Sequence, residues 1–171
     1  MTDKDKNNCS DSFNLKESFD HVPGVFDLVN EVIPGFKGLP LFDPKSACLD
    51  GLIIAVDFDG TCVTHKYPDI GEDIGAQEAL RDFSECGAKL ILWTMRHGPH
   101  LEAACEWFKK NSIPLYGVNQ NPDQHWSSSP KAYAHIYIDD SALGAPLVYK
   151  ENGERPHIDW KAIRDIIYLN R

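Results

Sequence analysis

Short runs of apolar residues alternate with amphipathic stretches along residues 51–171. The apolar runs are rich in Ile, Leu and Val, which is typical of strands buried on both faces. In the stretches between them apolar residues recur every three or four positions, as on one face of a helix. The predicted strands are 52–57, 88–94, 114–118, 134–139 and a short one at 147–149. The predicted helices are one near 73–86, then 99–110 and 159–169. This alternation predicts an α/β protein, a Rossmann-like three-layer fold around a mainly parallel central sheet.

The first fifty residues have a different pattern. Residues 1–12 are polar and predict a disordered tail, and residues 13–50 predict an N-terminal extension ahead of the domain at 51–171. Within the extension, apolar residues three and four apart predict one amphipathic helix at 22–33, which ends before Pro34 and Gly35. We expect this helix to pack on its own domain. The alternative is that it forms a dimer or partner surface, which would make the chain a homo-oligomer.

Composition and charge narrow the function classes. The net charge of −9 disfavours a general nucleic-acid binder, since phosphate backbones require a basic face. No apolar stretch approaches the length of a membrane span, and the polar N-terminus has no secretory h-region. Five cysteines without a C-x-x-C pair are typical of reduced thiols, which favours a cytoplasmic protein over a disulfide framework or zinc site.

Two carboxylates follow the first predicted strand. Asp57 and Asp59 are two positions apart, so the period of a strand turns both side chains to the same side. The carboxyl ends of parallel strands are where open α/β sheets carry their ligands. Acids crowded there repel each other unless a cation or a shared proton intervenes. The pattern therefore predicts a divalent metal with a nucleophile beside it.

The sequence Asp57-Phe58-Asp59-Gly60-Thr61 resembles the first signature of the haloacid dehalogenase (HAD) superfamily. The other signatures are matched in order by a strand ending at Thr94, by Lys131, and by the strand 136–140 ending in Asp139 and Asp140. The intervals between the signatures leave no room for a large cap domain. The resemblance therefore implies a capless member of the superfamily.

The resemblance also implies roles for four catalytic residues. Asp57 is expected to attack phosphorus and form an aspartyl-phosphate, and Asp59 to act as general acid and base. Thr94 is expected to hydrogen-bond the phosphoryl group, and Lys131 to neutralise its charge. An Asp at position 59 implies phosphate-ester chemistry rather than dehalogenation.

The implied cofactor is Mg²⁺, because hard cations prefer oxygen ligands. Its implied ligands are four acids: Asp57, Asp59 through its backbone carbonyl, Asp139 and Asp140. Of the last two we expect Asp140 to reach the metal, although their roles could be exchanged. Arg96 and His65 are candidate substrate-binding residues near the mouth of the site, and an ordinary surface role is the alternative for both.

The sequence thus predicts a magnesium-dependent phosphomonoester hydrolase that acts on a small phosphorylated metabolite or nucleotide. One alternative is a phosphatase of a macromolecule, such as a polynucleotide end or a phosphoprotein, which a capless site would admit. The net negative charge of the chain disfavours a polynucleotide substrate. Another alternative is a non-catalytic module that binds magnesium or phosphate. No membrane partner is expected.

Overall fold

The computed structural model describes residues 49–169. The predicted tail at 1–12 and the predicted helix at 22–33 lie outside these residues, as does the predicted extension 13–50 except for its last two positions. The Rossmann-like α/β domain predicted from residue 51 onward falls within them, apart from the final two residues.

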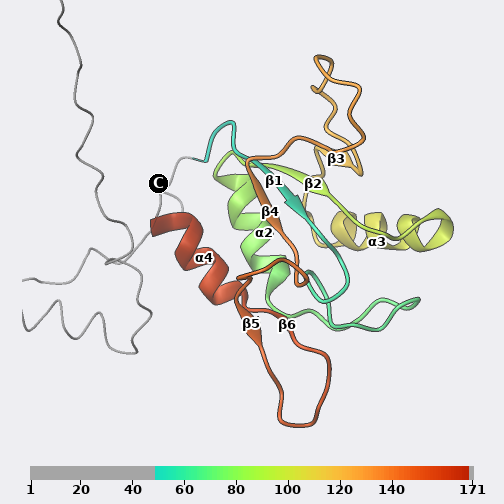
Figure 1. Cartoon of the computed structure of the whole chain (residues 1–171), viewed down its shortest axis with the longest axis vertical. Helices are drawn as coiled ribbons and strands as arrows, with labels where there is room; N and C mark the ends of the chain where they lie inside the picture. Colours follow the sequence, from blue (N-terminus) through green and yellow to red (C-terminus); the bar gives the residue numbers. More distant parts are fainter. Residues whose placement is uncertain (1–48, 170–171) are drawn as a thin grey trace, which may run out of the picture. The chain divides into compact units, whose positions relative to one another are not determined.

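A four-stranded parallel sheet forms the centre of the domain (Figure 1). The strands lie in the order β3-β2-β1-β4, so the first strand of the chain is central. Their bounds are β1 Ile53–Val56, β2 Lys89–Leu92, β3 Gly117–Val118 and β4 Ile136–Ile138. Val56 is in register with Leu92 on one side and with Ile138 on the other. The carboxyl ends of β1, β2 and β4 therefore meet at one edge, as the predicted parallel sheet requires.

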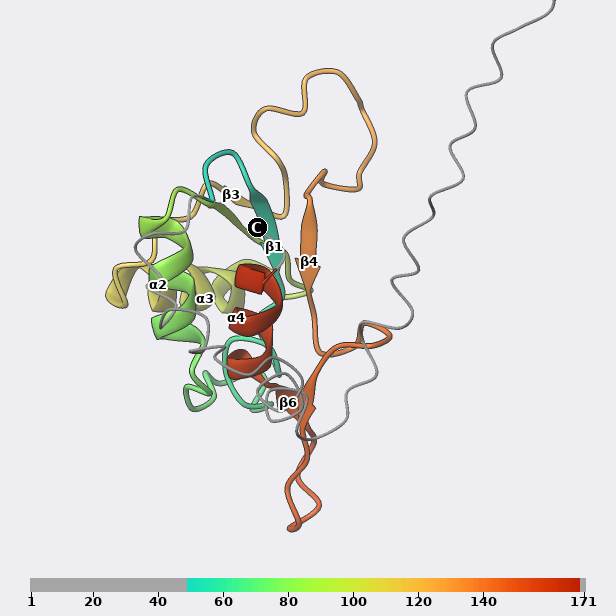
Figure 2. The same cartoon turned by 90° about the vertical axis from the view of Figure 1, so that its left-hand side faces the viewer.

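Three helices cover one face of the sheet (Figure 2). They are α2 Ala76–Glu85, α3 Gly98–Lys110 and α4 Trp160–Leu169. Their buried side chains join one hydrophobic core with Ile54, Val56 and Ile138, which share a face because strand side chains alternate. Phe83 from α2 and Phe108 from α3 are among the largest fully buried side chains of this core.

The opposite face of the sheet carries a loop and no helix within residues 49–169. A right-handed connection from β3 to β4 passes over this face, because β4 lies on the far side of β1. That connection, residues 119–135, is irregular and contains two prolines. Its Ala134 packs on Ala55 and Ile91 in a small second cluster. The predicted Rossmann-like α/β fold is confirmed, but in the described part of the chain a loop stands where a third layer of helices was expected.

A two-stranded antiparallel hairpin connects β4 to α4. It consists of β5 Leu147–Val148 and β6 His157–Ile158. The strand predicted at 147–149 is confirmed as β5, whereas β6 was not predicted. Two residues are too few for any periodicity to be detected.

Most of the observed elements are shorter than the predicted ones, with the exception of α3. The helix expected near 73–86 begins only at Ala76, because the Asp73 carboxylate accepts hydrogen bonds from the backbone N–H groups of Gly75 and Gln77. This local hydrogen bonding takes the place of a first helical turn.

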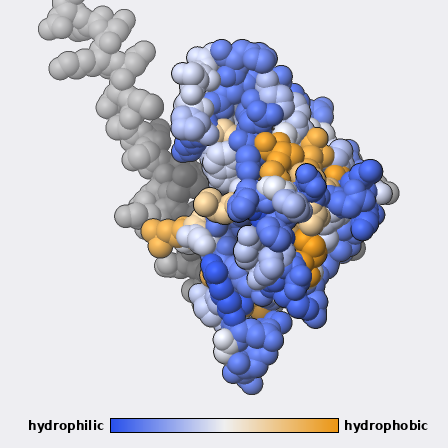
Figure 3. All heavy atoms as spheres, turned by 90° about the vertical axis from the view of Figure 1, so that its right-hand side faces the viewer, coloured by the Kyte–Doolittle hydropathy of each residue, from blue (hydrophilic) through white to orange (hydrophobic). Residues whose placement is uncertain are grey.

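Hydrophobic side chains occupy only small areas of the surface seen in Figure 3, which is mostly hydrophilic. Individual apolar residues such as Met95, Trp126 and Leu143 are exposed, and single exposures of this kind are normal. Among residues 49–169, no helix combines the length and the apolar character needed to cross a bilayer.

Candidate active site

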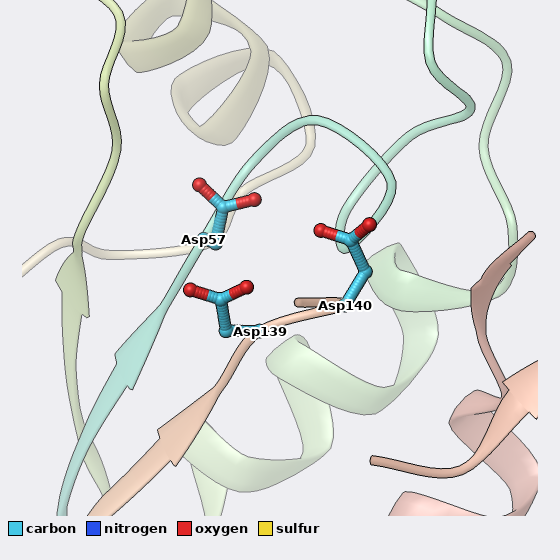
Figure 4. A group of neighbouring side chains, drawn as sticks. All are labelled: Asp57, Asp139 and Asp140. Atoms are coloured by element: carbon cyan, nitrogen blue, oxygen red, sulfur yellow. The ribbon is translucent and has the colours of Figure 1, made fainter. Parts of the chain in front are cut away.

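Three carboxylates converge where β1 and β4 end (Figure 4). Asp57 follows β1, and its backbone N–H donates to the carbonyl of Ile138 over 2.9 Å, so Asp57 lies beside the residues that follow β4. One carboxylate oxygen from each of Asp57, Asp139 and Asp140 lies within 4.8 Å of the other two. Oxygen atoms at this spacing could ligate one hard divalent cation.

Burial and like charge act together on Asp57. Burial is the main cause that raises the pKa of its carboxyl group from 3.8 to about 7. A hydrogen bond from the Phe58 backbone lowers this pKa, while the charges of Asp139, Asp140 and Asp59 raise it further. A proton or a cation at this position would relieve the repulsion among the acids.

Asp59 is held by Arg96. The Arg96 Nε donates to Asp59 Oδ2 and its Nη2 to Asp59 Oδ1, each over 2.7 Å, which makes a bidentate ion pair. Arg96 Nη1 donates to the Pro68 carbonyl over 3.0 Å, and Nη2 donates to the Asp69 carbonyl over 2.7 Å. The arginine side chain is only 1% exposed. Arg96 is thus buried beside Asp59 and not exposed at the mouth of the site, and its role in substrate binding stays a prediction.

His65 contacts Asp140 of the acid cluster. Its Nε2 lies 3.1 Å from Asp140 Oδ2, and the side chain is 16% exposed. Gly60 makes this approach possible, since a Cβ built there would lie 2.1 Å from His65 Nε2. Gly60 also has a φ of +84°, which favours glycine. His65 therefore lies at the acid cluster, and its substrate-binding role stays a prediction.

Thr61 connects the turn after β1 to two later parts of the chain. Its Oγ1 accepts from the Asp140 backbone N–H over 3.0 Å, and its carbonyl accepts from Trp160 Nε1 over 2.7 Å. Thr61 is fully buried. The carbonyl of the neighbouring Gly60 accepts from the Ile158 N–H over 2.9 Å, which ties β6 to the same turn. The hairpin and α4 thus help to hold the acid-bearing turn.

Thr94 lies at the same edge of the sheet, after β2. The Asn119 side chain fixes its backbone: Oδ1 accepts from the Thr94 N–H over 2.8 Å, and Nδ2 donates to the Thr94 carbonyl over 3.0 Å. The Thr94 hydroxyl accepts from the Arg96 N–H over 3.2 Å. Asn119 was not predicted, although its position just after a predicted strand could have drawn attention to it.

The structure does not bring Lys131 to the acid cluster. Lys131 precedes β4, and its loop extends from the end of the sheet opposite to the one where β1 and β4 terminate (Figures 1 and 2). Its side chain is exposed, and its Nζ lies 5.4 Å from the centre of the Tyr137 ring. Residues that precede a strand of a parallel sheet lie at its amino edge, whereas the three acids lie at the carboxyl edge. The place of Lys131 before β4 therefore explains why it does not reach them.

Two further residues, Cys62 and Arg155, contact the acids or their backbone. Cys62 is fully buried, its Sγ donates to the Asp57 carbonyl over 3.2 Å, and burial raises the pKa of its thiol. Such a thiol is a poor nucleophile. Arg155, in the turn before β6, places Nη2 at 3.4 Å from Asp140 Oδ2. No sequence signal pointed to Arg155, because it lies outside every recognisable motif.

One solved structure is similar to this chain over most of its length. It is described as the structure of a conserved protein coded by a locus from Bacteroides thetaiotaomicron. The two chains are 37% identical, the match covers 70% of this chain and 92% of the other, and the TM-score is 0.58. No family model and no curated protein matches the chain.

Proposed function

This chain belongs to the same family as the conserved Bacteroides thetaiotaomicron protein, and we propose that it is a magnesium-dependent phosphomonoester hydrolase of the HAD type. The observation that carries the proposal is the convergence of Asp57, Asp139 and Asp140 at the carboxyl ends of β1 and β4. The resemblance of the segments that carry Asp57, Thr94, Asp139 and Asp140 to HAD signatures also supports it. The substrate we propose is a small phosphorylated metabolite or nucleotide.

Magnesium fits the donor set, which consists of carboxylate oxygens alone. Asp57, Asp139 and Asp140 would hold it, with the Asp59 carbonyl as the fourth protein ligand implied by the resemblance. When bound, the ion would offset the repulsion between an anionic nucleophile and an anionic substrate.

Asp57 is the nucleophile in this proposal. Its carboxylate attacks the phosphorus atom, a bond forms between a carboxylate oxygen and phosphorus, and the ester bond to the leaving oxygen breaks. Water then hydrolyses the aspartyl-phosphate and releases inorganic phosphate. The Thr94 hydroxyl, at the same sheet edge, is the group we expect to donate a hydrogen bond to the phosphoryl oxygens.

Asp59 is the proposed general acid and base. Both of its oxygens accept hydrogen bonds from Arg96 in this structure. Each carboxyl oxygen has a second lone pair, so Asp59 can keep its hydrogen bonds to Arg96 and still exchange a proton with a leaving group.

The location we propose is the cytoplasm. Cys62 and Cys105 are free thiols, in keeping with a reducing compartment.

The proposal is tested by phosphate release from a panel of esters, in magnesium and in a chelator. The panel contains sugar phosphates, nucleotides, a phosphopeptide and a 5′-phosphorylated oligonucleotide, so that it separates small from macromolecular substrates. We expect magnesium-dependent release that Asp57→Asn reduces at least about 1,000-fold. The matched control is Asp123→Asn, the same change at an exposed acid of the 119–135 loop. Full activity of Asp57→Asn would contradict the mechanism.

A magnesium- or phosphate-binding module is the second candidate. The observation that favours it is the bidentate Arg96–Asp59 pair, which engages the residue expected to move protons. A module of this kind would bind magnesium or inorganic phosphate in a calorimetric titration and release no phosphate from any ester of the panel.

A further inference from the structure

The proposed hydrolysis needs a positive side chain at the phosphoryl group. Both the attacking carboxylate and the phosphoryl group are anions, and enzymes that transfer phosphoryl groups place a Lys or Arg there in addition to the metal. Lys131 was expected to fill this role, but it precedes β4 and its Nζ lies over the Tyr137 ring. Arg96 is buried and committed to Asp59. The position therefore requires another cation.

Arg155 is a basic side chain that already lies against the acid cluster. Its Nη2 is 3.4 Å from Asp140 Oδ2, the same oxygen that His65 approaches to 3.1 Å. The Arg155 side chain is 62% exposed, whereas that of Asp140 is 8% exposed. The guanidinium is thus a solvent-exposed cation in contact with a buried carboxylate of the cluster.

The backbone around Arg155 is anchored to the site. The Ile158 N–H donates to the Gly60 carbonyl over 2.9 Å, and the Asp159 N–H donates to the Pro146 carbonyl over 2.9 Å. On the far side of the turn, Lys150 and Glu154 form a solvent-exposed ion pair of 2.8 Å, which adds little stability. The two backbone hydrogen bonds hold the base of the hairpin beside the acid-bearing turn.

We propose that Arg155 is a catalytic residue whose guanidinium contacts the transferring phosphoryl group. The inference rests on the proposed hydrolase activity. A guanidinium suits this task because its planar donors can bind two phosphoryl oxygens at once. In this assignment Arg155 supplies, from the β5–β6 hairpin, the charge that the sequence signatures assign to Lys131.

The first measurement is steady-state hydrolysis of the best ester by Arg155→Ala, Arg155→Lys and Lys150→Ala. We expect Arg155→Ala to lower kcat/KM about 100-fold or more, mainly through kcat, as for the loss of one transition-state donor. Arg155→Lys should recover part of the rate, because it restores charge without the bidentate geometry. Lys150→Ala is the matched control on the same hairpin and should behave as wild type.

A second measurement separates catalysis from structural support. In calorimetric titrations with Mg²⁺ alone, Arg155→Ala should bind the ion as tightly as wild type or more tightly, because a positive charge beside Asp140 has been removed. Parallel weakening of Mg²⁺ binding and of kcat in Arg155→Ala would show that Arg155 only supports the fold of the site, and would overturn the proposal.

Lys131→Ala tests whether Lys131, and not Arg155, supplies the positive charge at the phosphoryl group. A large loss of kcat in Lys131→Ala, with activity retained in Arg155→Ala, would also overturn the proposal. If the wild-type protein released no phosphate, the hydrolase itself would be contradicted, and titration with inorganic phosphate in magnesium would decide the role of Arg155 separately. Loss of phosphate binding in Arg155→Ala would then support the contact, and unchanged binding would exclude it.

Discussion

At the scale of single residues, the environment of Asp57 couples protonation to folding. The folded protein holds the Asp57 proton with a pKa of about 7, compared with 3.8 for the ordinary group. A raised folded pKa stabilises the protein fully below the unfolded value, and this stabilisation is lost as the pH rises through the folded value. Metal-free protein should therefore lose the stabilisation provided by the protonated Asp57 carboxyl group as the pH rises from about 4 to about 7.

Part of this loss falls below pH 5, so the change expected between pH 5 and pH 8 is roughly 2–3 kcal/mol, at about 1.4 kcal/mol for each pKa unit. Urea unfolding in a chelator, at pH 5, 6, 7 and 8, measures it as the difference between wild type and Asp57→Asn. That difference should fall as the pH rises, and added Mg²⁺ should restore the wild type at pH 8. A difference that grew with pH would show that Asp57 is not held in its protonated form.

Arg96 offers a second prediction at this scale. Arg96→Met leaves Asp59 and two loop carbonyls without their donors, so we expect a loss of roughly 2–4 kcal/mol of unfolding free energy. The matched control is Arg164→Met, because Arg164 also forms ion pairs, with Glu78 and Asp82, but its side chain is 26% exposed. Its loss should be about 1 kcal/mol or less. Chemical denaturation measures both, and equal losses would contradict the importance of burial at Arg96.

At the scale of elements, the turn after β1 depends on Gly60. Gly60 and Gly51 both have positive φ, at +84° and +78°, but only Gly60 has neighbours within 4 Å of a built Cβ. Alanine at either position should cost about 1 kcal/mol for the backbone conformation. Gly60→Ala should in addition push His65 away from Asp140 and weaken magnesium binding several-fold.

Differential unfolding and magnesium titration of the two alanine variants test this expectation. Gly51→Ala should keep the magnesium affinity of the wild type while losing a similar amount of backbone stability. If both variants bound magnesium as tightly as wild type, the close packing of His65 against Gly60 would have no part in the metal site.

At the scale of the whole molecule, the regular apolar patterns in the sequence predicted the strands and helices, whereas contacts between residues distant in the sequence were missed. Buried parallel strands are continuous apolar runs, so β1, β2 and β4 and the acids that follow them were predictable. The ion pair of Arg96 with Asp59 joins residues 37 positions apart, and nothing local encodes it. Lys131 was assigned from its order in the chain, whereas its place in space follows from the direction of β4.

The hydrogen bonds from Ile158 to Gly60 and from Trp160 to Thr61 bear on when the site can be completed during synthesis. The Trp160–Thr61 hydrogen bond joins residues 99 positions apart. β4 ends at Ile138, so the four strands are synthesised before the partners of the acid-bearing turn. Pairing of β1 with β4 brings Asp57 beside Asp139, but the turn gains its support only after the hairpin and the start of α4 have docked. Tight metal capture by a nascent chain would therefore report that the domain is complete.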